Sequence, residues 1–178
     1  MATIRVTAGN LRGRRIPVAS SETRPTSERA RQAFFNIVAD RLSGAQFLDL
    51  FAGSGVFAFE AVSRGAESAT AVEHDRRKVE AIARLAKEWN AAVTAVHGEV
   101  LATLPRLRER FDVVYADPPY DFGAYDQLVG GISDLTLAPD AVVAIEHRRR
   151  TNPFNPAAGR LQIQRRAEYG EVWITFFA

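Results

Sequence analysis

The stretch QFLDLFAGSG (residues 46–55) joins a short apolar segment to a turn that contains two glycines. Residues 46–50 predict a buried strand, and residues 55–64 predict a helix that ends at Gly65. Gly53 and Gly55 permit a tight turn and a close backbone approach. The helix that follows directs free N–H groups and a positive dipole end at whatever lies there. The stretch therefore predicts a strand–turn–helix unit with a ligand at its turn.

Predicted strands and helices continue to alternate after this unit. Apolar strands alternate with helical segments, which predicts an α/β protein with a mainly parallel sheet and helices on both faces. The tail differs, because residues 161–167 and 172–177 alternate around Tyr169-Gly170 and predict a closing hairpin. Further predicted strands are 68–73, 93–97, 111–116 and 141–146, and predicted helices are 75–90, 99–108 and 123–134.

The segment before this unit predicts a small appendage. Residues 3–7 and 14–18 form two short strands around a glycine-containing turn, which indicates a hairpin. Ser27 is then predicted to cap a helix from Glu28 to about Arg41, which Gly44 ends. Residues 1–25 are the candidate extension and residues 26–178 the main domain.

Length and composition fit one ordinary domain. The chain has 178 residues, of which 47% are hydrophobic and 25% charged. It has no cysteine, and its three histidines lack metal-ligand spacing, so we predict no metal site. No apolar run approaches a membrane span, and the first residues lack the apolar stretch of a signal peptide. A cytoplasmic protein is expected.

Charge is distributed unevenly. The net charge is +2, yet residues 1–31 hold seven arginines and two glutamates. A second basic cluster is formed by Arg148–Arg150 with Arg160, Arg165 and Arg166. Clustered arginine indicates a polyanion such as nucleic acid, while a codon bias toward arginine is the alternative.

The tetrapeptide Asp117-Pro118-Pro119-Tyr120 follows the predicted strand 111–116. The prolines fix φ and favour extended geometry, which leaves the Asp117 and Pro118 carbonyls available to accept hydrogen bonds. Asp117 adds a charged acceptor, and Tyr120 offers a ring on which a base can stack. The set suits a planar heterocycle held by its amine; a plain Pro-Pro turn is the alternative.

Two cofactors fit the glycine turn. Residues 53–58 match G-x-G-x-x-A, the dinucleotide fingerprint, and Glu73 could accept ribose hydroxyls. The other candidate is S-adenosylmethionine, whose ammonium would pair with Asp49. A carboxylate beside the phosphates of a dinucleotide would repel them, so Asp49 favours S-adenosylmethionine.

With these motifs the chain resembles class I S-adenosylmethionine-dependent methyltransferases, and within them the bacterial RsmD-type 16S rRNA (guanine-N2)-methyltransferase family. The resemblance covers nearly the whole chain. Its marks are Gly9–Arg14 (GNLRGR), Arg24-Pro25-Thr26 with Arg29, Phe35-Asn36, residues 48–55 (LDLFAGSG), residues 60–65 (EAVSRG) and residues 117–120 (DPPY). The fold implied is a Rossmann-like, mostly parallel seven-stranded sheet with a C-terminal antiparallel hairpin, flanked by helices, plus the N-terminal β-hairpin extension.

The resemblance also implies roles for residues. Asp49, Gly53 and Gly55 would hold the methionine part of the cofactor, Glu73 the ribose and Glu99 the adenine amine, although the family more often has Asp or Asn at the last position. His74 would border the adenine ring or be an ordinary strand-end histidine. The implied cofactor site comprises Asp49, Phe51, Gly53, Ser54, Gly55, Glu73, His74, Glu99 and Val100.

The implied catalytic residues are Asp117, Pro118, Pro119 and Tyr120. The implied RNA-binding residues are Arg12, Arg14, Arg15, Arg24, Thr26 and Arg29. The implied partner is small-subunit ribosomal RNA, in a 30S particle or an assembly intermediate, bound by a monomer. An adenine-N6 methyltransferase, a dinucleotide-dependent oxidoreductase and a non-catalytic RNA-binding protein remain alternatives.

Overall fold

A seven-stranded sheet forms the centre of the computed structural model, which describes residues 2–18, 25–149, 153–155 and 159–178. The strand order is β5-β4-β3-β6-β7-β9-β8. The first five strands of this order are parallel, and β9 is antiparallel to both β7 and β8. The strands are β3 (Gln46–Leu50), β4 (Ser68–Glu73), β5 (Val93–His97), β6 (Arg110–Ala116), β7 (Thr136–Arg148), β8 (Ile163–Tyr169) and β9 (Val172–Phe177).

The sequence predicted this sheet closely. The predicted bounds of β3, β4 and β5 are confirmed to the residue, and the parallel sheet with a closing hairpin is confirmed. The predicted strand 141–146 is too short, because β7 already begins at Thr136 and runs through Pro139. A register shift between Phe111 and Val113 of β6 accompanies this first part of β7. A proline is tolerated in a strand at such an irregularity.

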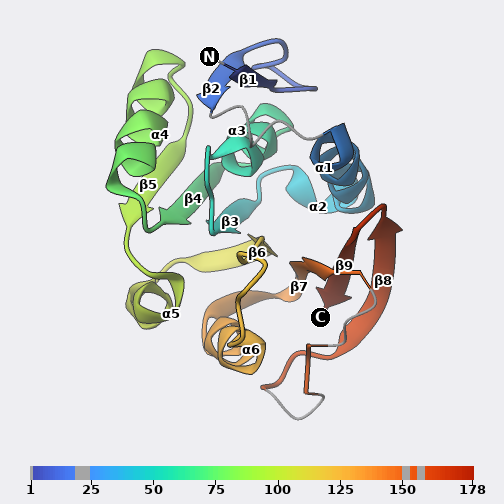
Figure 1. The fold of residues 1–178 in the computed structure, drawn as a ribbon. Coiled ribbons are helices and arrows are strands. Elements are labelled where there is room, and N and C mark those ends of the chain that lie inside the picture. Colours follow the sequence, from blue (N-terminus) through green and yellow to red (C-terminus); the bar gives the residue numbers. More distant parts are fainter. Residues whose placement is uncertain (1, 19–24, 150–152, 156–158) are drawn as a thin grey trace.

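Helices cover both faces of the sheet (Figure 1). On the upper face in that view lie α1, α3 and α4, and on the lower face lie α5 and α6. Each face has its own apolar core, one around Phe34, Phe47 and Ile82 and the other around Leu50, Leu104 and Leu128. The helices are α1 (Pro25–Ile37), α2 (Ala39–Leu42), α3 (Val56–Ser63), α4 (Arg76–Glu88), α5 (Val100–Thr103), the 3₁₀ helix η2 (Leu104–Arg106) and α6 (Tyr125–Ser133).

Two helix predictions were wrong in detail. The first helix does not begin after a Ser27 cap but at Pro25, where proline's fixed φ suits the first helical position and its missing N–H costs nothing. The same helix is interrupted at Val38 and resumes as α2. The predicted helix 99–108 is split into α5 and η2, because Pro105 lacks the N–H that would continue an α-helical ladder.

The predicted N-terminal hairpin is confirmed as β1 (Ala2–Arg5) and β2 (Arg15–Val18), which pair antiparallel. Its connecting loop is fixed to the C-terminal half of α3. Thr7 donates its N–H to the buried Glu60 at 2.9 Å, and Leu11 donates its N–H to Ser63 Oγ at 2.9 Å. Gly9 has φ +78°, and a Cβ there would lie 1.6 Å from the Ser63 carbonyl oxygen. Only glycine therefore fits this contact.

Candidate active site

The site predicted from the sequence lies where the strand order reverses. Strands β4 and β5 extend from one side of β3, and β6 and β7 extend from the other, so the crevice lies between the carboxyl ends of β3 and β6. The Asp117 N–H donates to the Leu50 carbonyl at 3.2 Å. The glycine turn and the Asp-Pro-Pro-Tyr segment therefore leave the sheet as immediate neighbours.

The glycine turn has the backbone that its sequence predicted. Phe51, Gly53 and Gly55 all have positive φ, at 61°, 55° and 77°. A Cβ on Gly55 would lie 2.8 Å from Ile82 Cγ1, so Gly55 lets α3 pack on α4. A Cβ on Gly53 would meet nothing closer than the Phe51 carbonyl oxygen at 4.0 Å. Gly53 is thus the glycine that leaves open space at the turn.

Glu73 closes this turn from the neighbouring strand. Its Oε2 accepts the Gly53 N–H at 2.7 Å, and its Oε1 accepts the Asp75 N–H at 2.9 Å. The side chain is almost fully buried. Oε1 is also 3.0 Å from His74 Nδ1, whereas Oε2 still has a second lone pair with which it can accept a hydroxyl. Glu73 therefore fits the predicted ribose role and also holds the turn in shape.

Asp49 lies buried beneath the same turn. Its Oδ2 accepts the Ala58 N–H at 3.2 Å, near the start of α3, where the N-cap Gly55 has no side chain to do so. Burial, and to a lesser extent the nearby Glu73, raise the pKa of Asp49 to about 8, although the Ala58 hydrogen bond lowers it. A buried carboxyl group of this kind favours a cationic partner.

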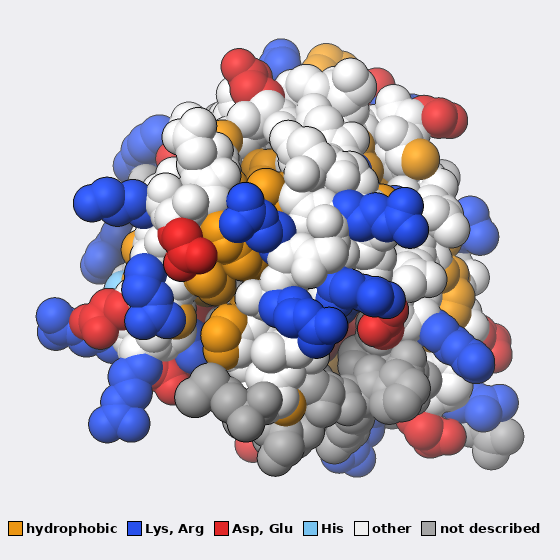
Figure 2. Space-filling view, turned by 90° about the horizontal axis from the view of Figure 1, so that it is seen from above, with side chains coloured by type: hydrophobic (Ala, Val, Ile, Leu, Met, Phe, Trp, Pro, Cys, Tyr) orange, Lys and Arg blue, Asp and Glu red, His pale blue; other side chains and the backbone are white. Residues whose placement is uncertain are grey.

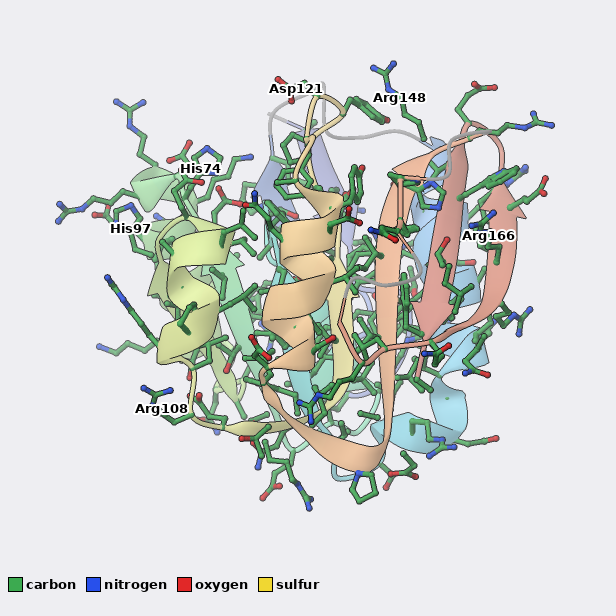
Figure 3. The ribbon with its side chains drawn as sticks, turned by 90° about the horizontal axis from the view of Figure 1, so that it is seen from below. His74, His97, Arg108, Asp121, Arg148 and Arg166 are labelled. Carbon is green, nitrogen blue, oxygen red and sulfur yellow. The ribbon has the colours of Figure 1, made fainter. Side chains whose placement is uncertain are left out.

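The predicted adenine end of the cofactor site is more open. The exposed His74 has its Nδ1 3.0 Å from Glu73 Oε1, and His97 Nε2 donates to the His74 carbonyl at 3.0 Å. Figure 3 shows both histidines at the sheet edge that also carries Asp121 and Arg148. Glu99 is exposed just before α5, whereas the Val100 side chain packs in the lower core. Val100 can thus offer a ligand only its backbone.

The Asp-Pro-Pro-Tyr segment presents free acceptors. Asp117 is exposed, and within the described part of the chain neither its carboxylate nor the Asp117 and Pro118 carbonyls accept a hydrogen bond. The Pro119 carbonyl is occupied, because it accepts the Phe122 N–H at 2.9 Å. The Tyr120 ring is 54% exposed, and the Arg148 guanidinium lies 4.9 Å from its centroid. The segment thus combines unoccupied oxygens with an accessible ring.

The sequence analysis did not single out Glu146 or Tyr115. The Tyr115 hydroxyl donates to Glu146 Oε2 at 2.6 Å, beside Asp117. The surrounding protein displaces water and so raises the pKa of Asp117 well above its usual range. The charges of Glu146 and then of Asp49 raise it further. Water at the exposed side of Asp117 screens these charges and reduces the rise. Burial also raises the pKa of Glu146. The position of Glu146 at the end of a predicted strand was the signal that could have indicated it.

A row of aromatic side chains runs from the glycine turn along this edge. Ring centroids lie 5.3 Å apart for Phe51 and Phe122, 5.2 Å for Phe122 and Tyr125, and 5.5 Å for Tyr125 and Phe154. Burial, followed by the charges of Asp117 and Glu146, raises the pKa of Tyr125. These rings form an apolar wall next to the free acceptors.

The predicted RNA-binding arginines do not gather at this edge. Arg12 and Arg14 lie in the hairpin loop that contacts Ser63, and the Arg14 guanidinium lies 5.7 Å from the Trp89 ring at the end of α4. The eight residues of α3 span about 12 Å, so this loop lies a helix length from the glycine turn. Figure 2 shows basic side chains across the middle of this hairpin-bearing face.

Two more of these predicted residues, Arg15 and Arg29, are exposed. Arg24 and the side chain of Thr26 lie outside the described residues.

Other features of the described surface do not compete with this edge. One hollow of about 430 Å³ is lined by Leu135, Pro139, Arg160 and their neighbours, and includes none of the predicted site residues. Among the described residues, no group of three or more His, Cys, Asp or Glu could hold a metal ion. No described helix is long and apolar enough to cross a membrane.

Comparison with known proteins gives a consistent answer. The family model described as "Conserved hypothetical protein 95" matches residues 4–178. The ribosomal RNA small subunit methyltransferase D of Escherichia coli K12 is 37% identical over 149 residues, which cover 80% of this chain and 74% of the relative. The chain belongs to the ribosomal RNA small subunit methyltransferase D family. The Haemophilus influenzae methyltransferase D is 32% identical over 150 residues, covering 80% of this chain and 78% of its own.

The methyltransferase D family assignment agrees with the fold. The solved structure of the Escherichia coli protein yhhF has a TM-score of 0.86 and 30% identity to this chain, and covers 99% of this chain and 97% of its own. The family match includes the hairpin, the glycine turn and the Asp-Pro-Pro-Tyr segment. Membership favours the methyltransferase interpretation of residues 53–58 over the dinucleotide one.

Proposed function

We propose that this methyltransferase D family member transfers a methyl group from S-adenosylmethionine to the exocyclic N2 of a guanine in 16S ribosomal RNA. The observation that carries the proposal is the contact of two strand ends, where Asp117 N–H bonds to Leu50. A methyl donor at the glycine turn and a flat amine at Asp117 would be next to each other there. The names of the curated relatives support ribosomal RNA as the substrate.

The residues around the glycine turn suit S-adenosylmethionine, which would supply an activated methyl group. Asp49 would pair with the ammonium of its amino-acid part, and Glu73 would accept a ribose hydroxyl through the remaining lone pair of Oε2. Gly53 leaves room for the ligand. Glu99 and the backbone at Val100 would face the adenine, with His74 at its border.

The acceptor side would work mainly by orientation and electrostatics. The guanine N2 amine is a poor nucleophile because its lone pair is shared with the ring. The Asp117 carboxylate and the Pro118 carbonyl would accept its N–H groups and direct the lone pair at the methyl carbon. Pro119 keeps this segment rigid, and Tyr120 would stack on the base, a contact worth about 1–3 kcal/mol. A base buried in folded RNA would have to turn outward to reach them.

The rest of the RNA would be bound away from the reacting base. The exposed Arg12, Arg14 and Arg15 of the extension formed by residues 1–25 would contact phosphates at a distance from the pocket. Arg29, which is exposed on α1, would contact phosphates as well, and the family resemblance implies the same role for Arg24 and Thr26. We propose that the substrate is small-subunit ribosomal RNA, within a small-subunit particle or an assembly intermediate.

The proposal is tested with Asp117→Ala and labelled methyl transfer to small-subunit particles. We expect this variant to lose activity while it still binds S-adenosylmethionine, and Asp121→Asn, which removes an exposed carboxylate from the same edge (Figure 3), to remain active. Nucleoside analysis of the product should give N2-methylguanine. Undiminished turnover by Asp117→Ala would refute the catalytic assignment, and N6-methyladenine as product would refute the guanine assignment.

A further inference from the structure

Glu146 has a partly buried carboxyl group, and the proposed reaction assigns it no role. It follows the last residue pair that β6 and β7 share, Ala116 with Ile145, so Asp117 and Glu146 are neighbours at the two strand ends. Side chains alternate along a strand, which places Tyr115 and Asp117 on the same face. Glu146 is on that face too, since it accepts the Tyr115 hydroxyl at 2.6 Å.

Tyr115 is a rigid support for this carboxylate. It is 1% exposed, and its ring stacks on Phe57 with 3.9 Å between centroids and 11° between planes. Burial and the nearby Glu146 raise the pKa of Tyr115 well above its usual value, so its hydroxyl stays protonated and donates the hydrogen bond to Glu146. A hydrogen bond to a charged acceptor is stronger than a neutral one. Glu146 is therefore held in one position.

The titratable groups around Asp117 come from three elements packed together. Asp49 lies on β3, Glu146 and Arg148 on β7, and Tyr125 on α6. On the α1 side, Arg31 lies near Tyr115. The surrounding protein raises the pKa of Asp117 most. The charge of Glu146 raises it further, and the charge of Asp49 adds a smaller rise.

We propose that Glu146, held by the Tyr115 hydroxyl, is a positioning residue for methyl transfer that sets the electrostatic environment of the Asp117 carboxyl. This inference rests on the proposed function. Two neighbouring carboxyl groups do not readily ionise together. The Tyr115 hydrogen bond favours the charge on Glu146, and that charge helps to raise the pKa of Asp117. Asp117 accepts hydrogen bonds from the guanine amine at full strength only when it is ionised.

The consequence is a specific pH dependence. Methyl transfer falls as the pH falls through the raised pKa of Asp117, because protonated Asp117 no longer accepts from the amine. Glu146→Gln removes the like charge but keeps an oxygen that accepts the Tyr115 hydroxyl. The pKa of Asp117 then drops, so the acid limb of the profile moves to lower pH.

The test is the pH profile of single-turnover methyl transfer by Glu146→Gln, with RNA and S-adenosylmethionine saturating at every pH. A shift of the acid limb to lower pH supports the inference. A slower reaction with an unmoved limb, or a shift to higher pH, overturns it, because a merely structural role would change the rate and leave the profile in place.

Two further variants make the test independent of folding. Tyr115→Phe removes the hydrogen bond that favours the charge on Glu146, so the acid limb of its pH profile should also move to lower pH, by less than in Glu146→Gln. An unmoved limb in Tyr115→Phe would overturn the support role of Tyr115. Asp121→Asn is the matched control and should keep the wild-type profile. If Asp117→Asn stayed active, the proposed function would fail; if it were inactive while Glu146→Gln kept the wild-type profile, only this inference would fail.

Discussion

Cofactor affinity should depend on pH through Asp49. This carboxyl group is 2% exposed and has a pKa of about 8, so about nine-tenths of it is protonated at neutral pH. A ligand ammonium pairs with the ionised form, and each pH unit below the pKa costs about 1.4 kcal/mol of binding. Affinity should therefore rise about 25-fold from about pH 6 to about pH 7.5, where an α-amino group is still mostly protonated.

The assay is isothermal titration with S-adenosylhomocysteine, the stable demethylated product. At about pH 6, binding should release close to one proton, which is measured by repeating the titration in buffers of different ionisation enthalpy. 5′-Methylthioadenosine lacks the amino-acid part and serves as the control ligand, with an affinity that stays flat over the same range. Asp49→Asn should likewise remove the pH dependence.

One result would refute this reasoning. If S-adenosylhomocysteine bound equally well at both pH values and released no proton, Asp49 would not pair with the ammonium. Its role would then be limited to accepting the Ala58 N–H at the start of α3.

Two other predictions concern the hairpin. Gly9→Ala should destabilise the protein by about 2–4 kcal/mol in urea unfolding, because its Cβ would overlap the backbone of Ser63; Gly13→Ala, also at positive φ but with nothing within 4 Å, should cost only about 1–2 kcal/mol. Equal losses of stability in the two variants would contradict the close contact between Gly9 and Ser63. The second prediction concerns the hairpin arginines Arg12, Arg14 and Arg15. Their joint replacement by Gln should weaken RNA binding and lower the slope of log K against log salt by about 2. An unchanged slope would place the RNA surface elsewhere, such as at the arginines near the end of β7.

The accuracy of the sequence-based fold followed local signals. Strands β3, β4 and β5 are short, mostly apolar runs, and their bounds were predicted to the residue. Pro139 was treated as outside any strand, but pairing with β6 and a register shift accommodate it within β7. Pro25 was treated as loop, although proline is favoured in the first turn of a helix. The error at Pro139 arose from strand pairing between segments distant in sequence. The error at Pro25 arose from the local backbone geometry of proline.

The candidate site was predictable to the extent that it consists of strand ends. Asp49, Gly53, Glu73 and Asp117 all lie at the carboxyl edge of the parallel sheet, which is where the topology places ligands. The partners of these residues were not predictable. The bond from Tyr115 to Glu146 depends on two strands distant in sequence, and the place of the hairpin arginines depends on the contact with Ser63.

The clustering of carboxyl groups at the site bears on which cofactor the site would bind. Asp49, Asp117 and Glu146 converge on one face of the sheet, and each has a raised pKa, chiefly because the surrounding protein displaces water. Such clustered carboxyl groups destabilise the free protein as they ionise, a cost that natural proteins accept at functional sites. A ligand that carries positive charge relieves this repulsion on binding, whereas a dinucleotide with its phosphates would add to it. The same acids that disfavour the empty site therefore favour a cationic methyl donor over the cofactor that shares its glycine motif.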